Sequence, residues 1–455
     1  MLTYELKKQP GVPLYEALYR CIRSDILDGT LKPHQRLPSK RALAANLEVS
    51  KITVETAYNQ LLSEGYIRAE ERRGYFVEPV GRNCGVQQPR AVPPRQEEPE
   101  DLVDLTANGS ASFPFSVWSR LQRQVLLDYG EKLLLPMPNR GAPELHRAIA
   151  DHLAGFRGMV VDPENILVGA GTDFLYNLLI QLLGRDKVYA VEEPGYGKIR
   201  KIYDAGGVAC VSAAMDSRGV VPGSLGDAGV LHISPSHHFP TGLVTSVSRR
   251  QELLEWAGED RFIIEDDYDS EFRFDARPKP TMFSLDRRGR VIYMNTFSKT
   301  LAPSIRISYM VLPEGLMESF QRRLGFYGCT VPSFEQMTLA AFLSKGYFEK
   351  HINRMRRFYR ARRNQVITLL KNSPRSRSLT ILEQDAGLHF IVRVDTSAED
   401  NALVALCREK GIRVRSLGSY YEGRVPTEDL HCLVVNYSGL ADGDLEKLAK
   451  ILDTI

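Results

Sequence analysis

The chain has 455 residues, of which 43% are hydrophobic and 25% charged, and its formal net charge is +3. This composition is that of an ordinary globular protein and excludes a mainly disordered, collagen-like or disulfide-stapled chain. Apolar runs are too short to span a membrane, the first residues lack a signal peptide's apolar stretch, and the six cysteines form no Cys-x-x-Cys pair. We therefore expect a cytoplasmic protein with reduced thiols, no metal cluster and no membrane partner.

The first 78 residues have the pattern of a small helical domain. Apolar spacing and turn residues predict helices over 14–26, 40–47 and 51–63 and strands over 66–68 and 75–77. Ser39 and Ser50 stand where they can cap the second and third helices. Helix, short turn, helix and basic hairpin is the winged helix-turn-helix plan, in which the third helix enters the DNA major groove. The alternative is a three-helix domain whose basic residues only face solvent.

In the DNA-binding interpretation, the starts of the second and third helices and the hairpin tip face base edges and phosphates of double-stranded operator DNA. The expected contacts are Ser39, Lys40, Arg41, Ser50, Lys51, Ile52, Thr53, Thr56, Arg72 and Arg73.

Residues 79–101 have the composition of a linker. They contain five prolines and few large apolar residues, so they cannot bury a core and favour extended backbone. The chain is therefore predicted to consist of a head over 1–78, this linker, and a body over 102–455.

Short apolar runs alternate with helical stripes along the body. Predicted strands lie at 187–191, 230–233, 262–265 and 291–294. This alternation indicates an α/β domain with a mostly parallel sheet, whose sites lie at the carboxyl ends of the strands, together with a smaller C-terminal α+β part.

Three motifs in the body suit an aldehyde cofactor that carries phosphate. Gly171 and Thr172 open a helix whose backbone N–H groups can meet a phosphate. Within EDDYDSEF, Asp266 can keep a ring nitrogen protonated and Tyr268 can donate to an oxygen on the same ring. The alternatives for this segment are an acidic solvated loop and a metal site, and the absence of a nearby histidine disfavours the metal.

The third motif is TFSKT, in which Lys299 follows a predicted strand. A lysine in this position can form a Schiff base with the aldehyde. Thr296, Ser298 and Arg306 can hold phosphate oxygens. Each motif has an ordinary alternative, but their order along the chain is informative.

The head resembles the GntR family of bacterial regulators through RLPSKRALA (36–44), VSKITVETAY (49–58) and LLSEGY (61–66), although His34 stands where that family usually has glycine. From about residue 102 onward, the order of EEPGY, PTG, EDDY and SK with a downstream arginine resembles the fold-type I aminotransferases, which use pyridoxal phosphate. A GntR head joined to such a body is the plan of the MocR subfamily of transcription regulators.

The resemblance implies pyridoxal 5'-phosphate as cofactor and a homodimer. It places the Schiff base on Lys299, pairs Asp266 or the adjacent Asp267 with the pyridine nitrogen, and lets Tyr268 donate to the ring hydroxyl oxygen. Tyr196, in EEPGY, would stack on the ring. The phosphate would be held by Gly171, Thr172, Thr296, Ser298 and Arg306.

Two departures from the aminotransferase pattern concern the oxygen of the cofactor ring and the carboxylate of the substrate. The amide of the Asn-Pro-Thr-Gly motif is replaced by Phe239, so Tyr268 or a nearby histidine must serve the ring oxygen. Val434 stands where aminotransferases carry the arginine that clamps the substrate carboxylate. Arg413 and Arg415 are near in sequence and can either replace that arginine or be surface residues of one strand.

We therefore expect a transcription regulator that senses an amine, an amino acid or pyridoxal phosphate itself. The alternatives are an aminotransferase with an accessory DNA-binding domain and a regulator whose body is only a dimerisation scaffold. Loss of the arginine disfavours the enzyme, and the presence of Lys299, Tyr268 and Arg306 disfavours the scaffold.

Overall fold

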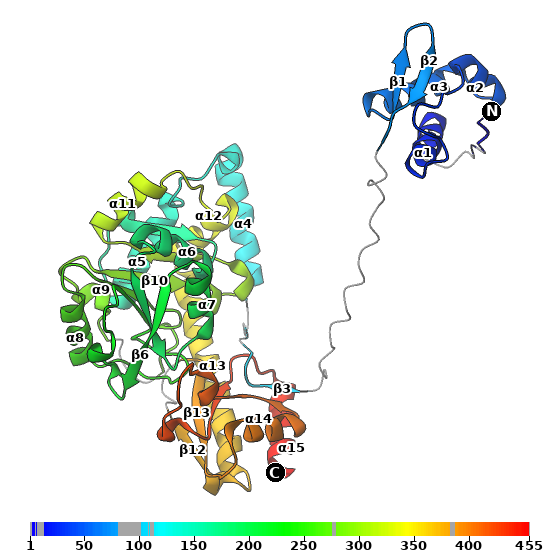
Figure 1. Ribbon diagram of the computed structural model, residues 1–455. Coiled ribbons are helices and arrows are strands. Elements are labelled where there is room, and N and C mark those ends of the chain that lie inside the picture. The colour runs from blue at the N-terminus through cyan, green and yellow to red at the C-terminus, as the bar shows by residue number, and fades with distance from the viewer. Residues whose placement is uncertain are drawn as a thin grey trace. The chain divides into compact units, whose positions relative to one another are not determined.

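The computed structural model describes residues 2–4, 6, 13–80, 102–107, 109, 113–274, 279–382 and 387–454. It divides into two compact units, Met1–Glu98 and Pro99–Ile455 (Figure 1). The predicted linker lies almost wholly outside the described residues, so the boundaries 1–78, 79–101 and 102–455 stay a prediction. Within the described residues, no helix is long and apolar enough to cross a membrane.

The first unit contains three helices and a two-stranded antiparallel hairpin. Its elements are α1 (Leu14–Leu27), α2 (Lys40–Asn46), α3 (Lys51–Ser63), β1 (Ile67–Glu70) and β2 (Gly74–Val77). The Ser39 and Ser50 hydroxyls accept the backbone N–H groups of Ala42 at 3.2 Å and Thr53 at 3.1 Å. Caps of this kind contribute about 1 kcal/mol each, which explains why α2 and α3 begin there.

A small core holds this first unit together. Leu18 and Ile22 of α1 pack with Val54, Ala57 and Leu61 of α3, and all five are fully buried. His34 adopts a φ of 64°, in the left-handed region that favours glycine. The left-handed backbone of this turn therefore explains why the GntR family usually has glycine at the position of His34.

The second unit is built on an eight-stranded sheet in the order β4-β11-β10-β9-β8-β5-β6-β7. The strands are β4 (Ile166–Gly169), β5 (Val188–Glu193), β6 (Ala209–Asp216), β7 (Gly219–Val220), β8 (Val230–Ile233), β9 (Phe262–Asp266), β10 (Val291–Thr296) and β11 (Ser308–Val311). The central strands β10, β9, β8, β5 and β6 run parallel, whereas β11 and β7 pair antiparallel with their neighbours. The predicted mostly parallel sheet is confirmed.

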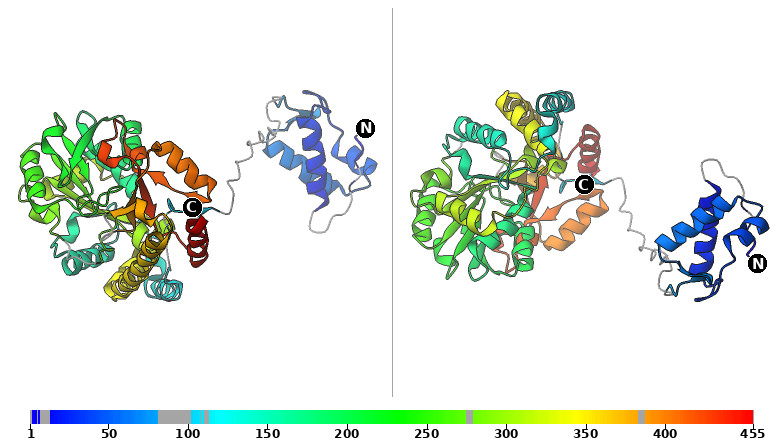
Figure 2. Two further views of the ribbon diagram at one scale, coloured as in Figure 1. Left: turned by 90° about the horizontal axis from the view of Figure 1, so that it is seen from below. Right: turned by 90° about the horizontal axis from the view of Figure 1, so that it is seen from above.

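Helices cover both faces of this sheet (Figures 1 and 2). Alternate residues of β10 explain why: Tyr293 packs with α5 (Pro143–Arg157) and α12 (Ser333–Ser344), whereas Ile292 and Met294 pack with α6 (Thr172–Leu183) and α11 (Glu314–Leu324). A strand covered on both faces buries successive side chains, which explains the apolar run 291–294 that precedes the polar end of β10 at the pocket.

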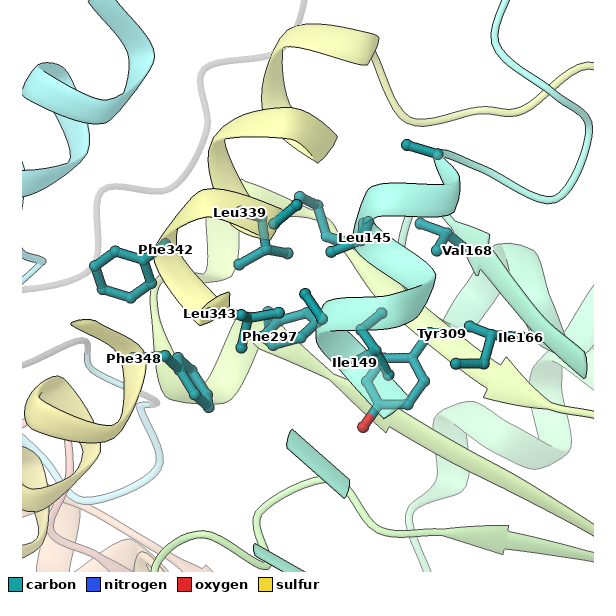
Figure 3. Packing of buried hydrophobic residues seen from close by; sticks show 14 of the residues in the cluster. Leu145, Ile149, Ile166, Val168, Phe297, Tyr309, Leu339, Phe342, Leu343 and Phe348 are labelled. Carbon is teal, nitrogen blue, oxygen red and sulfur yellow. The ribbon is translucent and has the colours of Figure 1, made fainter. Parts of the chain in front are cut away.

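Figure 3 shows the packing on the first of these faces. Leu145 and Ile149 of α5 lie with Leu339 of α12 and the strand residue Tyr309, and Phe342 of α12 lies nearer to Phe348 in the same cluster. Phe297, two residues before Lys299, belongs to the same cluster and is 3% exposed. The hydrophobic core therefore fixes the short helix that carries Lys299.

The remaining helices complete the large layer. They are α4 (Phe115–Tyr129), α7 (Gly197–Ala205), α8 (Val247–Ala257), α9 (Met282–Leu285) and α10 (Phe297–Thr300). The long α13 (Tyr347–Asn372) begins in the same core with Phe348 and Ile352 and continues into the core of the smaller C-terminal part.

The smaller α+β part lies at the C-terminal end, as predicted. Its antiparallel sheet has the order β12-β13-β16-β15, and a separate parallel pair joins β14 to β3. The elements are β3 (Val103–Asp104), β12 (Leu379–Leu382), β13 (His389–Val394), α14 (Asp400–Glu409), β14 (Ile412–Arg413), β15 (Arg415–Ser416), β16 (Cys432–Asn436) and α15 (Asp442–Thr454). The start of the body thus pairs with its C-terminal part.

Candidate functional site

One pocket lies where the carboxyl ends of β5, β8, β9 and β10 meet. It is lined by eight of the nine residues predicted for the cofactor: Thr172, Tyr196, Asp266, Tyr268, Thr296, Ser298, Lys299 and Arg306. The ninth, Gly171, lies directly against Arg306. Strands that run parallel bring their carboxyl ends to one edge of the sheet, which is why motifs far apart in the sequence converge here.

Asp266 ends β9 and is buried at the inner wall of the pocket. Its Oδ2 accepts the hydroxyl of Tyr176 from α6 and lies 3.6 Å from Nε2 of His232. Its Oδ1 is buried and has no hydrogen-bond partner among the described residues. A buried carboxylate oxygen without a partner is costly, so this atom suits a bound group that brings a proton, such as a pyridinium nitrogen.

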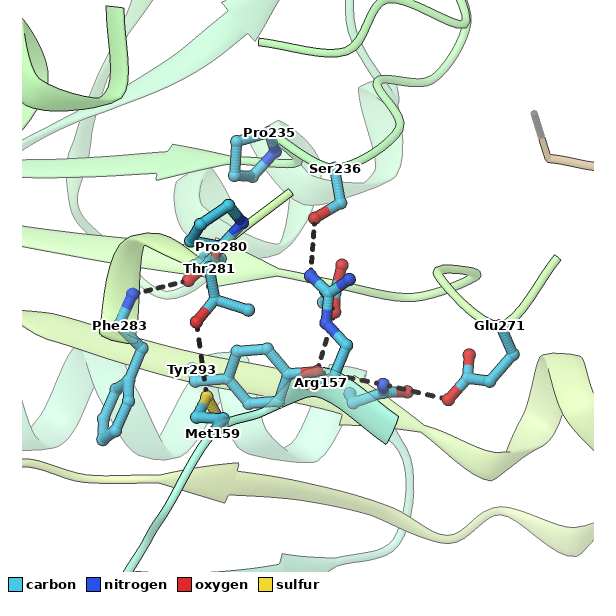
Figure 4. A network of polar contacts seen from close by, with 12 residues as sticks. Arg157, Met159, Pro235, Ser236, Glu271, Pro280, Thr281, Phe283 and Tyr293 are labelled. Atoms are coloured by element: carbon cyan, nitrogen blue, oxygen red, sulfur yellow. Dashed lines mark hydrogen bonds and ion pairs between the residues drawn. The ribbon is translucent and has the colours of Figure 1, made fainter. Parts of the chain in front are cut away.

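Asp267 is not part of the pocket lining. It lies 3.1 Å from Arg157 and accepts the Tyr293 hydroxyl at 2.7 Å. Arg157 also donates to Ser236 at 3.0 Å, within the buried network of Figure 4. Of the two aspartates that the sequence leaves open, only Asp266 therefore borders the pocket.

Tyr268 is flanked by a histidine that the sequence analysis did not name. Nδ1 of His237 lies 2.8 Å from the Asp269 carboxylate and 3.4 Å from the Tyr268 hydroxyl. Burial raises the pKa of Tyr268 well above its usual value, so its hydroxyl keeps its proton and can donate. Tyr268 lines the pocket, and His237, which does not, lies beside the Tyr268 hydroxyl.

Lys299 lies on α10 with its Nζ 6.0 Å from the centre of the Tyr268 ring. Burial lowers the pKa of the Lys299 ammonium, and the negative charges of Asp269 and Asp266 offset that effect only in part. A lysine with a lowered pKa carries a larger share of the neutral amine, which is the nucleophilic form.

The opposite end of the pocket is suited to a phosphate. Arg306 lies 3.4 Å from Asp173, and Ser298 Oγ is buried without a hydrogen-bond partner among the described residues. Thr172 begins α6, whose first backbone N–H groups face this end. Thr296 also lines the pocket, but its hydroxyl accepts the Ser298 N–H at 3.1 Å and so caps α10.

Four residues that line the pocket had no predicted role: Tyr176, Glu192, His232 and His389. His237 does not line the pocket but contacts Asp269 and Tyr268, which do. Glu192 is the first residue of the EEPGY segment, and this position was the only signal in the sequence that could have identified it. Its side chain is 9% exposed, and burial raises its pKa to about 8. The others lie on separate elements and have no local signature.

The predicted DNA contacts lie on the first unit at two helix starts and the hairpin tip. Lys51 and Ile52 at the start of α3 are exposed, Ile52 by 74%. Arg41, Thr56 and Arg72 are exposed as well.

Two predicted DNA contacts are already engaged within the domain. Lys40 forms an ion pair with Glu55 at 2.8 Å, and Arg73 forms one with Glu70 at 2.5 Å. The other predicted cations, Arg41, Lys51 and Arg72, are exposed and form no ion pair with the described residues. Ser39, Ser50 and Thr53 contribute to the helix caps.

The sheet and the pocket together define the body as an aminotransferase-like domain. The family model for aminotransferase class I and II matches residues 100–452, and that for bacterial regulatory proteins of the gntR family matches residues 14–77. A kynurenine aminotransferase from Pyrococcus horikoshii has the same fold, with a TM-score of 0.67 and 23% identity over 78% of this chain and 91% of that one.

Relatives extend over the whole chain. The HTH-type transcriptional regulator YdeL of Bacillus subtilis is 34% identical, covering 99% of this chain and 98% of its own. The probable rhizopine catabolism regulatory protein MocR of Rhizobium meliloti is 33% identical, covering 96% and 92%. The chain therefore belongs to the MocR-type GntR transcription regulators, in which a DNA-binding helix-turn-helix domain is fused to an aminotransferase class I and II domain. The family implies operator DNA, a small-molecule effector and pyridoxal phosphate as its ligands.

Proposed function

We propose that this regulator holds pyridoxal phosphate through Lys299 and responds to an amine that enters the same pocket. Pyridoxal phosphate supplies an aldehyde that condenses with primary amines and a pyridine ring that withdraws electrons. The observation that carries the proposal is the meeting of a buried amine, an unpartnered carboxylate oxygen and an arginine beside a helix start.

The residues at the two ends of the pocket would bind different parts of the cofactor, the ring at one end and the phosphate at the other. Asp266 Oδ1 would hold the proton of the pyridine nitrogen, and Tyr268 would donate to the ring oxygen. Arg306, Ser298 and the start of α6 would bind the phosphate. These contacts satisfy polar atoms that otherwise stay unpaired, so they favour cofactor binding.

The test is the visible absorbance of the purified protein with added pyridoxal phosphate, compared with that of Lys299→Ala. A band that the substitution abolishes supports the proposal. Absence of a band in the unsubstituted protein overturns it and leaves a DNA-binding protein whose body does not use this cofactor.

The second candidate function for the same pocket is that of a working aminotransferase. Val434 lines the pocket from β16 and is 3% exposed, so the position expected for a carboxylate-clamping arginine holds only methyl groups. Of the two arginines that could replace it, Arg413 pairs with Asp104 at 3.2 Å, and Arg415 hydrogen-bonds to Tyr420. We therefore expect no sustained formation of keto acid from amino acids, measured over many turnovers.

The protein would act as a homodimer, in the cytoplasm where its operator lies. The supporting observation is an apolar surface on α4 and the turn that follows it, where Leu127 is 76% and Leu134 75% exposed. Exposed apolar side chains of this size mark interaction surfaces. Sedimentation equilibrium of the full chain tests the dimer, and a double change of Leu127 and Leu134 to Glu should produce monomers.

A further inference from the structure

The outer part of the cofactor pocket, away from Asp266 and Arg306, has its own chemistry. It is formed by Leu105, Glu193, Tyr196, Phe239, Leu388, His389, Tyr420, Glu422 and Val434. A molecule joined by its amine to the cofactor would direct its far end toward these side chains. The chemical groups that can bind to these side chains therefore determine which amine the regulator detects.

Rings form one wall of this outer part. The Phe239 ring centre lies 5.9 Å from that of Tyr196, 5.0 Å from His389 and 5.2 Å from Tyr420. Burial lowers the pKa of His389 well below its usual value, so its ring is neutral at neutral pH and does not repel a cation. Faces of aromatic rings attract cations, with Trp and Tyr the most effective in proteins.

Carboxylates stand at the mouth of the same region. Glu193 Oε1 accepts the backbone N–H groups of Glu422 and Gly423 at 2.8 and 2.9 Å. Burial alone would raise the pKa of Glu193, but the N–H donors of Gly423 and Glu422 hold it below its usual value, so the group stays ionised. The Glu422 side chain is exposed and forms no hydrogen bond or ion pair with the described residues.

The cationic side chains of the pocket are engaged elsewhere. Arg200 donates to the Cys210 carbonyl at 3.1 Å and to Ser212 at 2.7 Å. Lys198 pairs with Asp173 at 2.7 Å, and Arg306 lies at the end suited to the phosphate. Arg415, opposite Val434 on the neighbouring strand, hydrogen-bonds to Tyr420, and the charge of Arg200 acts on Glu193. A carboxylate at the far end of the effector would thus meet Glu193, Glu422 and the methyl groups of Val434, beside cations that already have partners.

From this arrangement we infer that the effector is an amine whose far end carries a second positive charge and no carboxylate, that is, a diamine. The inference rests on the proposed function, since it assumes that the first amine joins the cofactor. One amine would react at the cofactor, and the other would lie among the aromatic rings and face Glu193 and Glu422. Opposite charges attract across this region, whereas like charges placed together are penalised.

The experiment compares putrescine, butylamine and γ-aminobutyrate, which share a chain length and differ only at the far end. Each is titrated into the full chain loaded with pyridoxal phosphate, and binding is followed by the change in the visible band. We expect putrescine to bind about tenfold more tightly than butylamine, or about 1.4 kcal/mol, and γ-aminobutyrate to bind most weakly. The longer set of cadaverine, pentylamine and δ-aminovalerate is measured in the same way, because the depth of the pocket sets the best chain length.

The matched variant is Glu422→Gln, which removes one exposed carboxylate and leaves the cofactor contacts intact. It should reduce the affinity for the diamine and leave that for butylamine unchanged. Val434→Arg, checked by thermal unfolding, should reverse the order of putrescine and γ-aminobutyrate.

The outcomes separate this inference from the proposed function. If the three compounds of each set bind equally, or if the amino acid binds most tightly, the inference of a diamine effector is overturned. The visible band persists in that case, so the proposed function is not affected. If the protein has no visible band that depends on Lys299, the proposed function is overturned as well. Preference for the diamine that Glu422→Gln does not change overturns the role of Glu422.

Discussion

The guanidinium of Arg306 lies directly against the α-carbon of Gly171, so closely that a β-carbon at position 171 would overlap it. Gly171 also has a φ of 90°, a conformation that other residues rarely adopt. The glycine therefore does more than begin α6: it makes room for the arginine at the end of the pocket that is suited to phosphate.

Gly171→Ala should displace Arg306 and weaken the binding of pyridoxal phosphate by at least about tenfold, since a charge-assisted contact contributes about 1.5–3 kcal/mol. The measurement is a titration of the cofactor followed by visible absorbance. Gly155→Ala is the control, because Gly155 lies within α5 and has open space around its β-carbon position. The control should bind the cofactor normally and gain about 0.5–1 kcal/mol of stability from helix propensity. Equal cofactor binding by both variants would contradict the role assigned to Gly171.

Asp266 and Asp267 should respond differently to the same change. Asp266→Asn should weaken cofactor binding and leave the fold intact, because Asp266 borders the pocket and forms no ion pair with an arginine or lysine of the described residues. Asp267→Asn should lower the free energy of unfolding by about 3–5 kcal/mol, because it leaves the buried Arg157 without its counter-ion. Denaturant unfolding and cofactor titration on both variants check this. The reverse pattern would mean that Asp267 serves the cofactor.

Glu192 should make stability depend on pH. Its pKa is raised by burial from 4.5 to about 8, so the folded protein keeps a proton that the unfolded chain releases between these pH values. Stability is therefore lost as pH rises through this window, with a slope of up to about 1.4 kcal/mol per pH unit, and it levels off above pH 8.

Glu192→Gln removes this proton exchange and keeps an oxygen that can accept the Ser234 N–H. The variant should match the unsubstituted protein near pH 4.5 and become progressively more stable than it up to pH 8. Denaturant unfolding across this range measures the difference, in which the effects of other groups cancel. Parallel pH profiles would show that Glu192 is ionised in the folded protein.

Lys51 and Ile52 should affect DNA binding in different ways, since one is a cation and the other apolar at the exposed start of α3. Lys51→Ala should reduce the slope of log affinity against log salt by about 1, as expected for one phosphate contact. Ile52→Ala should keep that slope and change the preferred bases. The probes are duplexes selected from a random library by the unsubstituted protein, and Arg20→Ala, on α1 and paired with Glu16, is the control. A reduced slope in Ile52→Ala or an unchanged slope in Lys51→Ala would contradict these assignments.

Local signals in the sequence were sufficient for the head and for the main strands of the body. Helix α3 begins at Lys51 and ends at Ser63 as predicted, because its cap and its apolar spacing are both local. Helix α2 ends at Asn46, one residue earlier than predicted, which is within the fraying of any helix end. Strand β8 has the predicted bounds, and β5, β9 and β10 extend one or two residues further toward the pocket.

The sequence by itself also determined which residues are able to bind the cofactor, since Lys299 and Arg306 lie on one continuous segment with Ser298. Only the tertiary structure determined which other residues complete the cofactor site. Tyr176 comes from α6, His232 from β8 and Val434 from β16, and these elements meet through strand pairing and helix packing between distant parts of the chain. The choice of Asp266 over Asp267 also depends on tertiary structure, because neighbouring residues of an extended chain point to opposite sides and only packing determines which side is the pocket.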